Sequence, residues 1–341
     1  MRRSLTTEIL PTHTAALFHA AVQRAAAALR TGEVVAVPTE TVYGLAANAL
    51  DASAVARIYA IKGRPAHNPI IVHVAGKTMV RRCVREWPAA ADKLARAFWP
   101  GPLTLVLPKA ADIPDIVTAG GPTVGVRWPA HPFVQAVIRE CGFPLAAPSA
   151  NRSNQLSPTT AEHVRKQLGG RLRWLVDGGP APIGIESTVL DLTTHPPQIL
   201  RPGMIHAEAL AAVIGERPRP PGPACRPPSP LRSPGMLRKH YAPRARVIVL
   251  TWHDTAVLQK QLTARGRPLD TAWIVAHTRI PAAAGFAGVS VLPHDAAAYA
   301  RALYAEWYRC DEAGAKTIVM EAPPDATAWS GVADRLRRAA A

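Results

Sequence analysis

The sequence predicts an α/β protein in two parts, a large mixed α+β domain followed by a small domain with a parallel sheet. Up to residue 215, strand-like and helix-like segments follow one another without clean alternation, which favours a mixed sheet over a doubly wound one. Residues 217–234 contain eight prolines in eighteen positions, and proline lacks the N–H and the backbone freedom that helices and central strands need. Beyond this extended linker, strands and helices alternate regularly, as in a parallel sheet. We place the three parts at residues 1–215, 216–243 and 244–341.

The individual elements follow from apolar periodicity and from turn residues. In the first domain, helices are expected over residues 14–31 (ended by Gly32), 52–61, 89–98, 131–141 and 159–168. Strands are expected over residues 34–38, 69–74, 103–107, 123–127, 145–147, 172–176, 187–192 and 198–201. In the C-terminal domain, strands are expected over residues 247–251, 272–276, 289–292 and 317–320, and helices over residues 254–264, 295–309 and 326–340.

Composition excludes several classes of protein. No run of 18 apolar residues is present, so no membrane span is expected. The four cysteines lie too far apart in the sequence for a CxxC or zinc-knuckle spacing, which suits reduced thiols in a cytoplasmic protein. The formal net charge of +16 favours an anionic partner, either nucleic acid or small anionic substrates, or it reflects base composition alone.

Two segments in the first part of the chain carry polar residues with possible binding roles. The segment PTETVYGL directly follows the strand over residues 34–38, so that Thr39 and Thr41 lie in a loop of the kind that presents ligand-binding side chains. Lys62 and Arg64 lie two residues apart in an irregular segment and can converge on one polyanion. The alternatives are an ordinary polar turn and a solvated charge pair. His73, inside an apolar strand, is either a core histidine or a functional one.

Later segments add further candidates. Arg127 ends an apolar strand, where a buried arginine needs an anionic partner, either a structural carboxylate or a substrate carboxylate. Ser149 and Asn151 follow the strand over residues 145–147 and can hydrogen-bond a ligand, whereas Ser157 can serve simply as a helix cap.

No nucleotide-binding or covalent-catalysis motif accompanies these residues. The sequence contains no GxxxxGK[ST] loop, and no GxSxG or HExxH motif. A glycine-rich stretch at 178–188 and the RPG segment at 201–203 allow close backbone approach to a ligand instead. A set rich in hydroxyl, Arg, Lys and Asn side chains suits anion binding and charge stabilisation rather than covalent catalysis.

Seven motifs in order resemble the threonylcarbamoyl-AMP synthase family, with its YrdC-like twisted, mixed open sheet around a large concave cavity. They are PTETVYGL, KGRPAHNPIIVHV, FWPGPLTLVL, TVGVRWPAHP, PLAAPSAN, GIEST and LRPG. The segment SPGMLRKHYAP at 233–243 is similar to the junction of the long, two-domain members, whose second domain is a small Rossmann-like unit. The chain departs from the family in its tail, which reads ADRLRR at 333–338 instead of carrying an Asn-Arg pair. That departure leaves any role of the tail open.

The resemblance implies site residues, carried over by matching motif positions. It implies that Lys62 and Arg64 are catalytic. Positions implied to contact ATP are Lys62, Arg64, Asn68, Thr123, Ser149, Asn151, Ser157, Arg201 and the linker residue Tyr241. Positions implied to contact threonine are Thr39 or Thr41, His73, Arg127, Ala147 (through its backbone) and Ser187. No protein-bound metal site is implied.

The resemblance also implies a reaction, in which L-threonine, bicarbonate and ATP, with Mg²⁺, give threonylcarbamoyl-AMP and pyrophosphate. A separate transferase complex then uses the product to modify tRNA, and weak tRNA binding by this chain is a further expectation. A non-catalytic RNA-binding module is the alternative, because a groove suited to ATP phosphates also suits RNA. A carbamoyl-transfer domain of hydrogenase maturation is a third hypothesis, although such chains are larger and carry zinc-finger cysteines.

Overall fold

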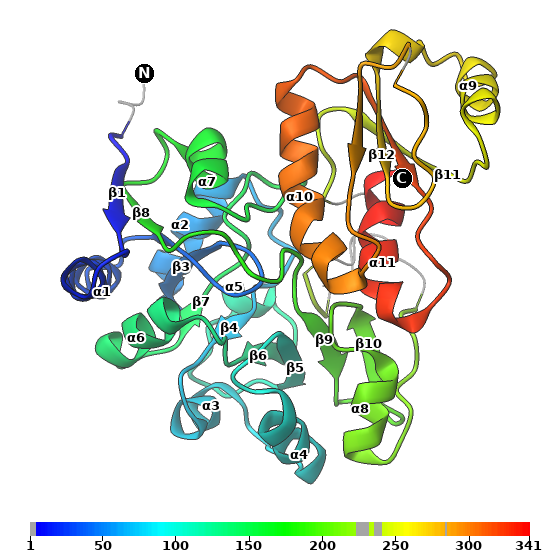
Figure 1. The fold of residues 1–341 in the computed structure, drawn as a ribbon. Coiled ribbons are helices and arrows are strands. Elements are labelled where there is room, and N and C mark those ends of the chain that lie inside the picture. Colours follow the sequence, from blue (N-terminus) through cyan, green and yellow to red (C-terminus); the bar gives the residue numbers. More distant parts are fainter. Residues whose placement is uncertain (1–4, 223–231, 235–240, 284) are drawn as a thin grey trace.

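The computed structural model describes residues 5–222, 232–234, 241–283 and 285–341, which form two sheets (Figure 1). The first has ten strands in the order β1-β8-β2-β3-β7-β4-β6-β5-β9-β10. These strands are β1 (Glu8–Pro11), β2 (Val35–Val37), β3 (Gly44–Asn48), β4 (Val72–His73), β5 (Leu103–Pro108), β6 (Thr123–Arg127), β7 (Leu145–Ala146), β8 (Trp174–Asp177), β9 (Thr188–Asp191) and β10 (Gln198–Arg201). The sheet contains both parallel pairs, such as β4–β6, and antiparallel pairs, such as β5–β6, so the predicted mixed sheet is confirmed.

Helices cover both faces of this sheet because side chains of successive strand residues point to opposite faces. Val35 and Val37 pack in a core with α1 and α6, whereas Ala36 faces a second core with α2 and α4. Thr14 and Asp51 cap the N-termini of α1 and α2. The helices are α1 (Ala15–Arg30), α2 (Ala52–Lys62), α3 (Lys77–Cys83), α4 (Ala89–Phe98), α5 (Asp115–Thr118), α6 (Pro132–Cys141), α7 (Ala161–Leu168) and α8 (Ala207–Ile214).

The second sheet has four strands, all in parallel pairs, in the order β11-β14-β12-β13, as the alternating pattern predicts. Its strands are β11 (Arg246–Leu250), β12 (Ala272–Ala276), β13 (Gly288–Val291) and β14 (Thr317–Glu321). Helix α9 (Thr255–Thr263) covers one face, and α10 (Ala296–Glu312) and α11 (Ser330–Ala339) cover the other. Two short 3₁₀ turns, Leu269–Thr271 and Thr327–Trp329, complete the domain.

The structure differs from the sequence prediction mainly in short elements. Strands β1 and β3 and helices α3, α5 and α8 were not predicted, because segments of four to eight residues carry little periodic signal. Strand β4 keeps only two of the six residues expected over 69–74. The helix expected over 326–340 is divided into a 3₁₀ turn and α11. The described linker residues contain no helix or regular strand, as the prolines predict, and part of the segment at 233–243 lies outside the described residues.

Helices α10 and α11 join the second domain to the first (Figure 1). Val42, Leu156 and Ile185 of the first domain share one hydrophobic core with the inner faces of both helices. The backbones approach closely at two glycines. A Cβ at Gly184 would lie 2.5 Å from the carbonyl oxygen of Ala300, and a Cβ at Gly331 would lie 2.8 Å from that of Gly203. The C-terminal domain is therefore packed directly on loops of the large sheet.

Candidate functional site

The loop between β2 and β3 carries two threonines with different surroundings. The Thr39 hydroxyl lies 2.6 Å from the carbonyl oxygen of Val42 and accepts from the N–H groups of Thr41 and Val42, so it holds the loop's own shape. The Thr41 hydroxyl accepts a hydrogen bond of 2.9 Å from Nη1 of Arg127 on β6. The two hydroxyls lie 3.0 Å apart, so Thr41 is tied to the buried cation and to Thr39, whereas the other contacts of Thr39 are to the loop backbone.

Arg127 forms an ion pair with Glu40, which lies between the two threonines in the β2–β3 loop. Its Nη2 lies 2.7 Å from Glu40 Oε1, and both side chains are less than a tenth exposed. Burial favours the neutral form of Glu40, yet the guanidinium of Arg127 outweighs burial and holds the pKa of the carboxyl below its usual value. Besides this ion pair, Arg127 donates from Nε to the carbonyl of Gly101 and from Nη1 to Thr41, so these contacts use three of the five N–H groups of its guanidinium. The arginine therefore keeps donor capacity beside the ion pair.

His73 is the register partner of Arg127 across β4 and β6 and is 4 % exposed. Burial, together with the nearby charge of Arg127, lowers the pKa of His73 to about 3. Its Nδ1 is buried without a hydrogen-bond partner. A neutral imidazole with an unpaired ring nitrogen is suited to hydrogen bonding to a ligand rather than to attracting an anion.

These side chains line one small cavity of about 50 Å³. Its lining comes from the β2–β3 loop, the ends of β4, β6, β7 and β10, the loop before β9, and the linker. The lining residues are Thr39, Thr41, Val42, Tyr43, Gly44, Arg64, Ile71, His73, Arg127, Ala147, Pro148, Ser149, Glu186, Arg201, Pro234 and Tyr241. Segments from most of the first domain's length thus converge on it.

Arg64 and Arg201 bring two further positive charges to the cavity. Arg64 donates from Nε to the carbonyl of Asn68 at 2.9 Å and from Nη2 to Asn68 Oδ1 at 2.8 Å, which fixes the plane of its guanidinium. Burial lowers the pKa of Arg64 to about 10, so it stays charged at neutral pH. Arg201 donates to the carbonyl and the hydroxyl of Ser187, each at 3.0 Å.

Lys62 lies outside the cavity lining. Its ammonium donates to the carbonyl oxygens of Ser149 and Asn151 and to Asn151 Oδ1, so the residue ties the end of α2 to the segment PSAN. Burial, and then the charge of Arg64, lowers the pKa of Lys62 well below its usual value. The Asn151 amide donates to the carbonyls of Arg152 and Gln155. In this arrangement Lys62 and Asn151 shape the loop that presents Ser149.

Three other predicted positions also lie behind the lining. Ser187 is held by Arg201 and by the Thr104 hydroxyl at 2.8 Å. Ser157 donates to Glu186 rather than acting as a helix cap. Thr123 borders a separate cavity of about 10 Å³ beside Ser233 and Pro234.

Sequence reasoning did not single out Glu186, although it lies within the motif GIEST. It lines the cavity and is 6 % exposed. Its Oε2 lies 2.8 Å from Nε of Arg335 on α11 and accepts from the Tyr304 hydroxyl at 3.1 Å. Burial favours the neutral form, but Arg335 and Arg201 hold the pKa of Glu186 below its usual value. The available signal was a carboxylate that follows Gly184 by two residues and directly precedes a Ser-Thr pair.

Tyr241 closes the cavity from the linker side. It is 1 % exposed and lines the cavity, while its ring lies 6.3 Å from that of Tyr304 and under the guanidinium of Arg335 at 5.0 Å. It therefore both covers the cavity and packs on the second domain. Lys239 and His240 lie outside the described residues.

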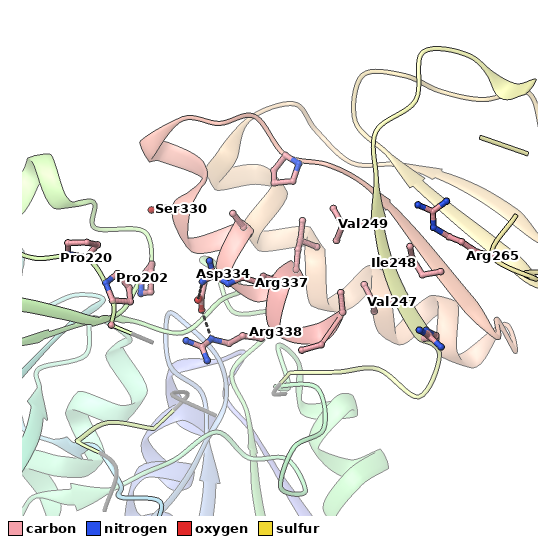
Figure 2. Close-up of a pocket in the computed structure, with 18 of the residues that line it drawn as sticks. Pro202, Pro220, Val247, Ile248, Val249, Arg265, Ser330, Asp334, Arg337 and Arg338 are labelled. Carbon is pink, nitrogen blue, oxygen red and sulfur yellow. Dashed lines mark hydrogen bonds and ion pairs between the residues drawn. The ribbon is translucent and has the colours of Figure 1, made fainter. Parts of the chain in front are cut away.

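The cavity can bind anions and exclude water. Three arginines line it, and the carboxylate in its lining, Glu186, is already paired with Arg335, while Glu40 behind the lining is paired with Arg127. Among the described residues no group of three His, Cys, Asp or Glu side chains is placed to hold a metal ion. A second, open cleft of about 1370 Å³ lies elsewhere, between β11, α11 and the start of the linker (Figure 2). Arg246, Arg265 and Arg267 line it, together with residues of α11.

Comparisons with known proteins find similar sequences for both domains. A family model described as "Telomere recombination" matches residues 27–203, and one described as "Threonylcarbamoyl-AMP synthase, C-terminal domain" matches residues 205–341. The threonylcarbamoyl-AMP synthase of Pyrococcus abyssi is 48 % identical over 229 residues, which are 67 % of each chain. That of Bacillus subtilis is 51 % identical over 225 residues, 66 % of this chain and 65 % of that one.

Two solved structures extend the comparison to the fold. The crystal structure of P. abyssi Sua5 complexed with L-threonine has a TM-score of 0.88 and 38 % sequence identity, covering 98 % of both chains. The E. coli protein YciO has a TM-score of 0.51 and 22 % identity over 58 % of this chain, which is a likeness of fold alone. Within the described part of the chain, none of the helices combines the length and apolar character needed to cross a bilayer.

Proposed function

The chain belongs to the threonylcarbamoyl-AMP synthase family, and we propose on that basis that it converts L-threonine, bicarbonate and ATP into threonylcarbamoyl-AMP and pyrophosphate. One observation carries the proposal. One cavity is lined by a neighbouring set of an arginine, a hydroxyl and a neutral imidazole (Arg127, Thr41 and His73) and by two further arginines, Arg64 and Arg201. The first set suits an amino acid, and the second suits a polyphosphate.

The threonine end is formed by Arg127, Thr41 and His73. Arg127 retains donor capacity for the substrate carboxylate despite its pairing with Glu40. We assign the substrate contact to Thr41 rather than Thr39, because the hydroxyl of Thr39 is already committed to the loop backbone. His73 Nδ1 and the backbone of Ala147 would complete this end of the cavity.

The chemistry needs no protein nucleophile. The threonine amine adds to bicarbonate with loss of water, giving a carbamate. A carbamate oxygen then forms a bond to the α-phosphorus of ATP as the bond from that phosphorus to the bridging oxygen breaks and pyrophosphate leaves. Arg64 and Arg201 would neutralise charge on the phosphates, which is positioning and electrostatic catalysis. Lys62 contributes by holding the loop of Ser149, so we give it a positioning role.

Mg²⁺ would enter with ATP, as its counter-ion. Glu40 and Glu186 are both paired with arginines, so the cavity offers no free carboxylate to the ion. Phosphate oxygens and water would then supply most of its ligands, as is usual for Mg²⁺ on nucleotides. The ion would lower the charge of the triphosphate and make pyrophosphate a better leaving group.

Closure by Tyr241 protects the product. Both the carbamate and the mixed anhydride react with water, and an enclosed site slows that loss. A cavity of about 50 Å³ is smaller than the several hundred Å³ that sites for drug-sized ligands occupy. We therefore expect the Tyr241 ring to move aside when ATP enters and to close over it afterwards.

The product would pass to a tRNA-modifying transferase complex in the cytoplasm. The arginines of the open cleft in Figure 2 offer a surface for weak, salt-dependent tRNA contact. A purely RNA-binding role accounts less well for the site, because an RNA backbone has no need of the buried set of Arg127, Thr41 and His73.

The reaction is tested directly by incubating the protein with ATP, MgCl₂, L-threonine and ¹³C-bicarbonate. Pyrophosphate is followed by a coupled assay and the adenylate by mass spectrometry. We expect pyrophosphate release that depends on all three substrates, and an adenylate carrying one ¹³C atom. Nucleic-acid binding without any adenylate would instead support the RNA-binding module. Leaving out threonine is the matched control.

A further inference from the structure

We propose that Arg335, on the C-terminal helix α11, is a positioning residue of the active site that holds its nucleotide-binding wall in place. The proposal rests on the proposed function, and it gives the C-terminal domain a direct part in the reaction. Arg335 lies outside the cavity lining, so it would act through the groups that it holds.

The side chain of Arg335 is fully buried and joins three segments around the cavity. Its Nε lies 2.8 Å from Glu186 Oε2, and its Nη2 lies 3.1 Å from the carbonyl oxygen of Glu186. Its Nη1 donates to the carbonyl of Pro202 at 2.9 Å. Its guanidinium carbon lies 5.0 Å from the ring centroid of Tyr241.

Each of these segments carries a group of the nucleotide end. Glu186 itself lines the cavity and accepts from Ser157. Pro202 directly follows Arg201, which lines the cavity. Tyr241 covers it. The threonine end differs in this respect, because Thr41, Arg127 and His73 are held by groups of the first domain alone. Ser187, the threonine position next to Glu186, is also anchored within the first domain, by Thr104 and Arg201. Loss of Arg335 should therefore disturb the two ends of the cavity unequally.

The guanidinium of Arg335 is itself held in orientation by Asp334. This carboxylate is 1 % exposed and lies 3.1 Å from Nη1 of Arg335. Arg337 and Arg338 donate to it as well, at 2.6 and 2.9 Å, as Figure 2 shows. Asp334 thus fixes the guanidinium of Arg335, whereas the contact of the exposed Arg337 with Asp334 is screened by water and contributes little.

Only arginine fits this position. Its planar fork donates to the carboxylate, to two carbonyls and to a ring face at once, whereas a lysine ammonium is a point charge on a flexible stem. Helix α11 comes close enough because Gly331 faces Gly203 without a side chain between them. Lysine would restore the charge beside Glu186 but not the contacts to both carbonyls.

The test compares full-length Arg335→Ala, Arg335→Lys and Arg337→Ala with the wild type by steady-state kinetics for ATP and for threonine. Arg337 is the matched control, since it shares the helix and the Asp334 contact but its side chain is 70 % exposed. We expect Arg335→Ala to lower kcat at least tenfold and to raise KM for ATP at least fivefold, with KM for threonine within twofold. Arg335→Lys should recover part of kcat, and Arg337→Ala should stay within twofold of the wild type throughout.

Wild-type values of kcat and KM for ATP in a folded Arg335→Ala or Arg335→Lys variant would overturn the proposal. So would equal losses for ATP and threonine, which indicate general destabilisation. If Arg335→Ala does not fold, Arg335→Lys decides. A wild-type protein that makes no adenylate would instead refute the proposed function, and ATP affinity measured by calorimetry would then test the role of Arg335 by the same comparison.

Discussion

Single residues at the threonine end of the cavity are distinguished by what their polar atoms already contact. Thr39 and Thr41 are two positions apart and equally buried, yet only Thr41 is bonded to Arg127. Glu40 between them neutralises that arginine. Charge, hydroxyl and imidazole are thus arranged by short, local contacts, and each can be tested separately.

Replacing the Thr41 hydroxyl should impair threonine use specifically. We expect Thr41→Val to lower kcat/KM for threonine about 5- to 150-fold, because an unpaired buried arginine donor costs about 1–3 kcal/mol. Thr41→Ser keeps the hydroxyl and should remain within a few-fold of the wild type. Steady-state kinetics with varied threonine give both values. Equal kcat/KM for the Val and Ser variants would show that the hydroxyl is not used.

His73 should make the protein less stable in acid. Its folded pKa of about 3 lies below its ordinary value of 6.5, so between these pH values the unfolded chain binds a proton that the folded protein does not. This contribution to stability is fully present above pH 6.5 and is lost as the pH falls toward 3. The free energy of unfolding should therefore fall with decreasing pH by up to about 1.4 kcal/mol per pH unit through this one group.

The comparison with His73→Gln isolates that slope. Other histidines with lowered pKa, such as His163, contribute equally to both proteins and cancel. Urea denaturation between pH 4 and 7 should give a flatter profile for the variant. Parallel profiles for the two proteins would mean that His73 is not buried in neutral form.

Among the elements, α11 contacts the first domain through its backbone near its first turn. It begins at Ser330, and its second residue, Gly331, contacts the backbone of Gly203. Two residues before Gly203, strand β10 ends at the cavity-lining Arg201. The position of this helix and the position of the cavity wall are therefore coupled through one backbone contact.

A methyl group at this contact should push the helix away. We expect Gly331→Ala to destabilise the protein by about 1–3 kcal/mol through overpacking and to lower pyrophosphate release by displacing Arg335. Gly76→Ala is a suitable control, since a Cβ at Gly76 would meet nothing within 4 Å. Thermal unfolding and the coupled assay measure the two effects. An active, fully stable Gly331→Ala protein would contradict the coupling.

At the scale of the whole molecule, the two domains and the linker enclose one site. The large sheet supplies most of the cavity wall, and the linker supplies Tyr241. The C-terminal domain supports both through Tyr304 and Arg335. Neither domain alone would exclude water from this cavity.

Removing the Tyr241 ring should uncouple pyrophosphate release from product recovery. We expect Tyr241→Ala to yield less adenylate per pyrophosphate released, because water reaches the mixed anhydride, and to cost about 3–5 kcal/mol of stability as for other large aromatic truncations. Tyr241→Phe keeps the ring and should retain the wild-type ratio. Quantifying both products in one reaction gives the ratio. An unchanged ratio in Tyr241→Ala would show that the ring is not the cover.

The sequence by itself determined the mixed first sheet, the parallel second sheet, the break between them and most of the motifs around the cavity. These features depend on local signals, namely apolar periodicity, proline content and short polar segments after strands. The positions of β6 and β10 were predicted to the residue for that reason. The short strand β3 was missed because its residues belong to a motif that reads as a loop.

Only the tertiary structure decided which polar groups face the cavity and which support it from behind. Lys62 and Arg64 are equivalent in sequence pattern, yet one holds a loop and the other lines the cavity. The pairing of Glu186 with Arg335 joins residues 149 positions apart. Such pairings follow from the packing of α11 on the first domain. A buried charge needs a partner of opposite charge, and a residue distant in the sequence can supply it. The sequence around either residue does not predict such a long-range pairing.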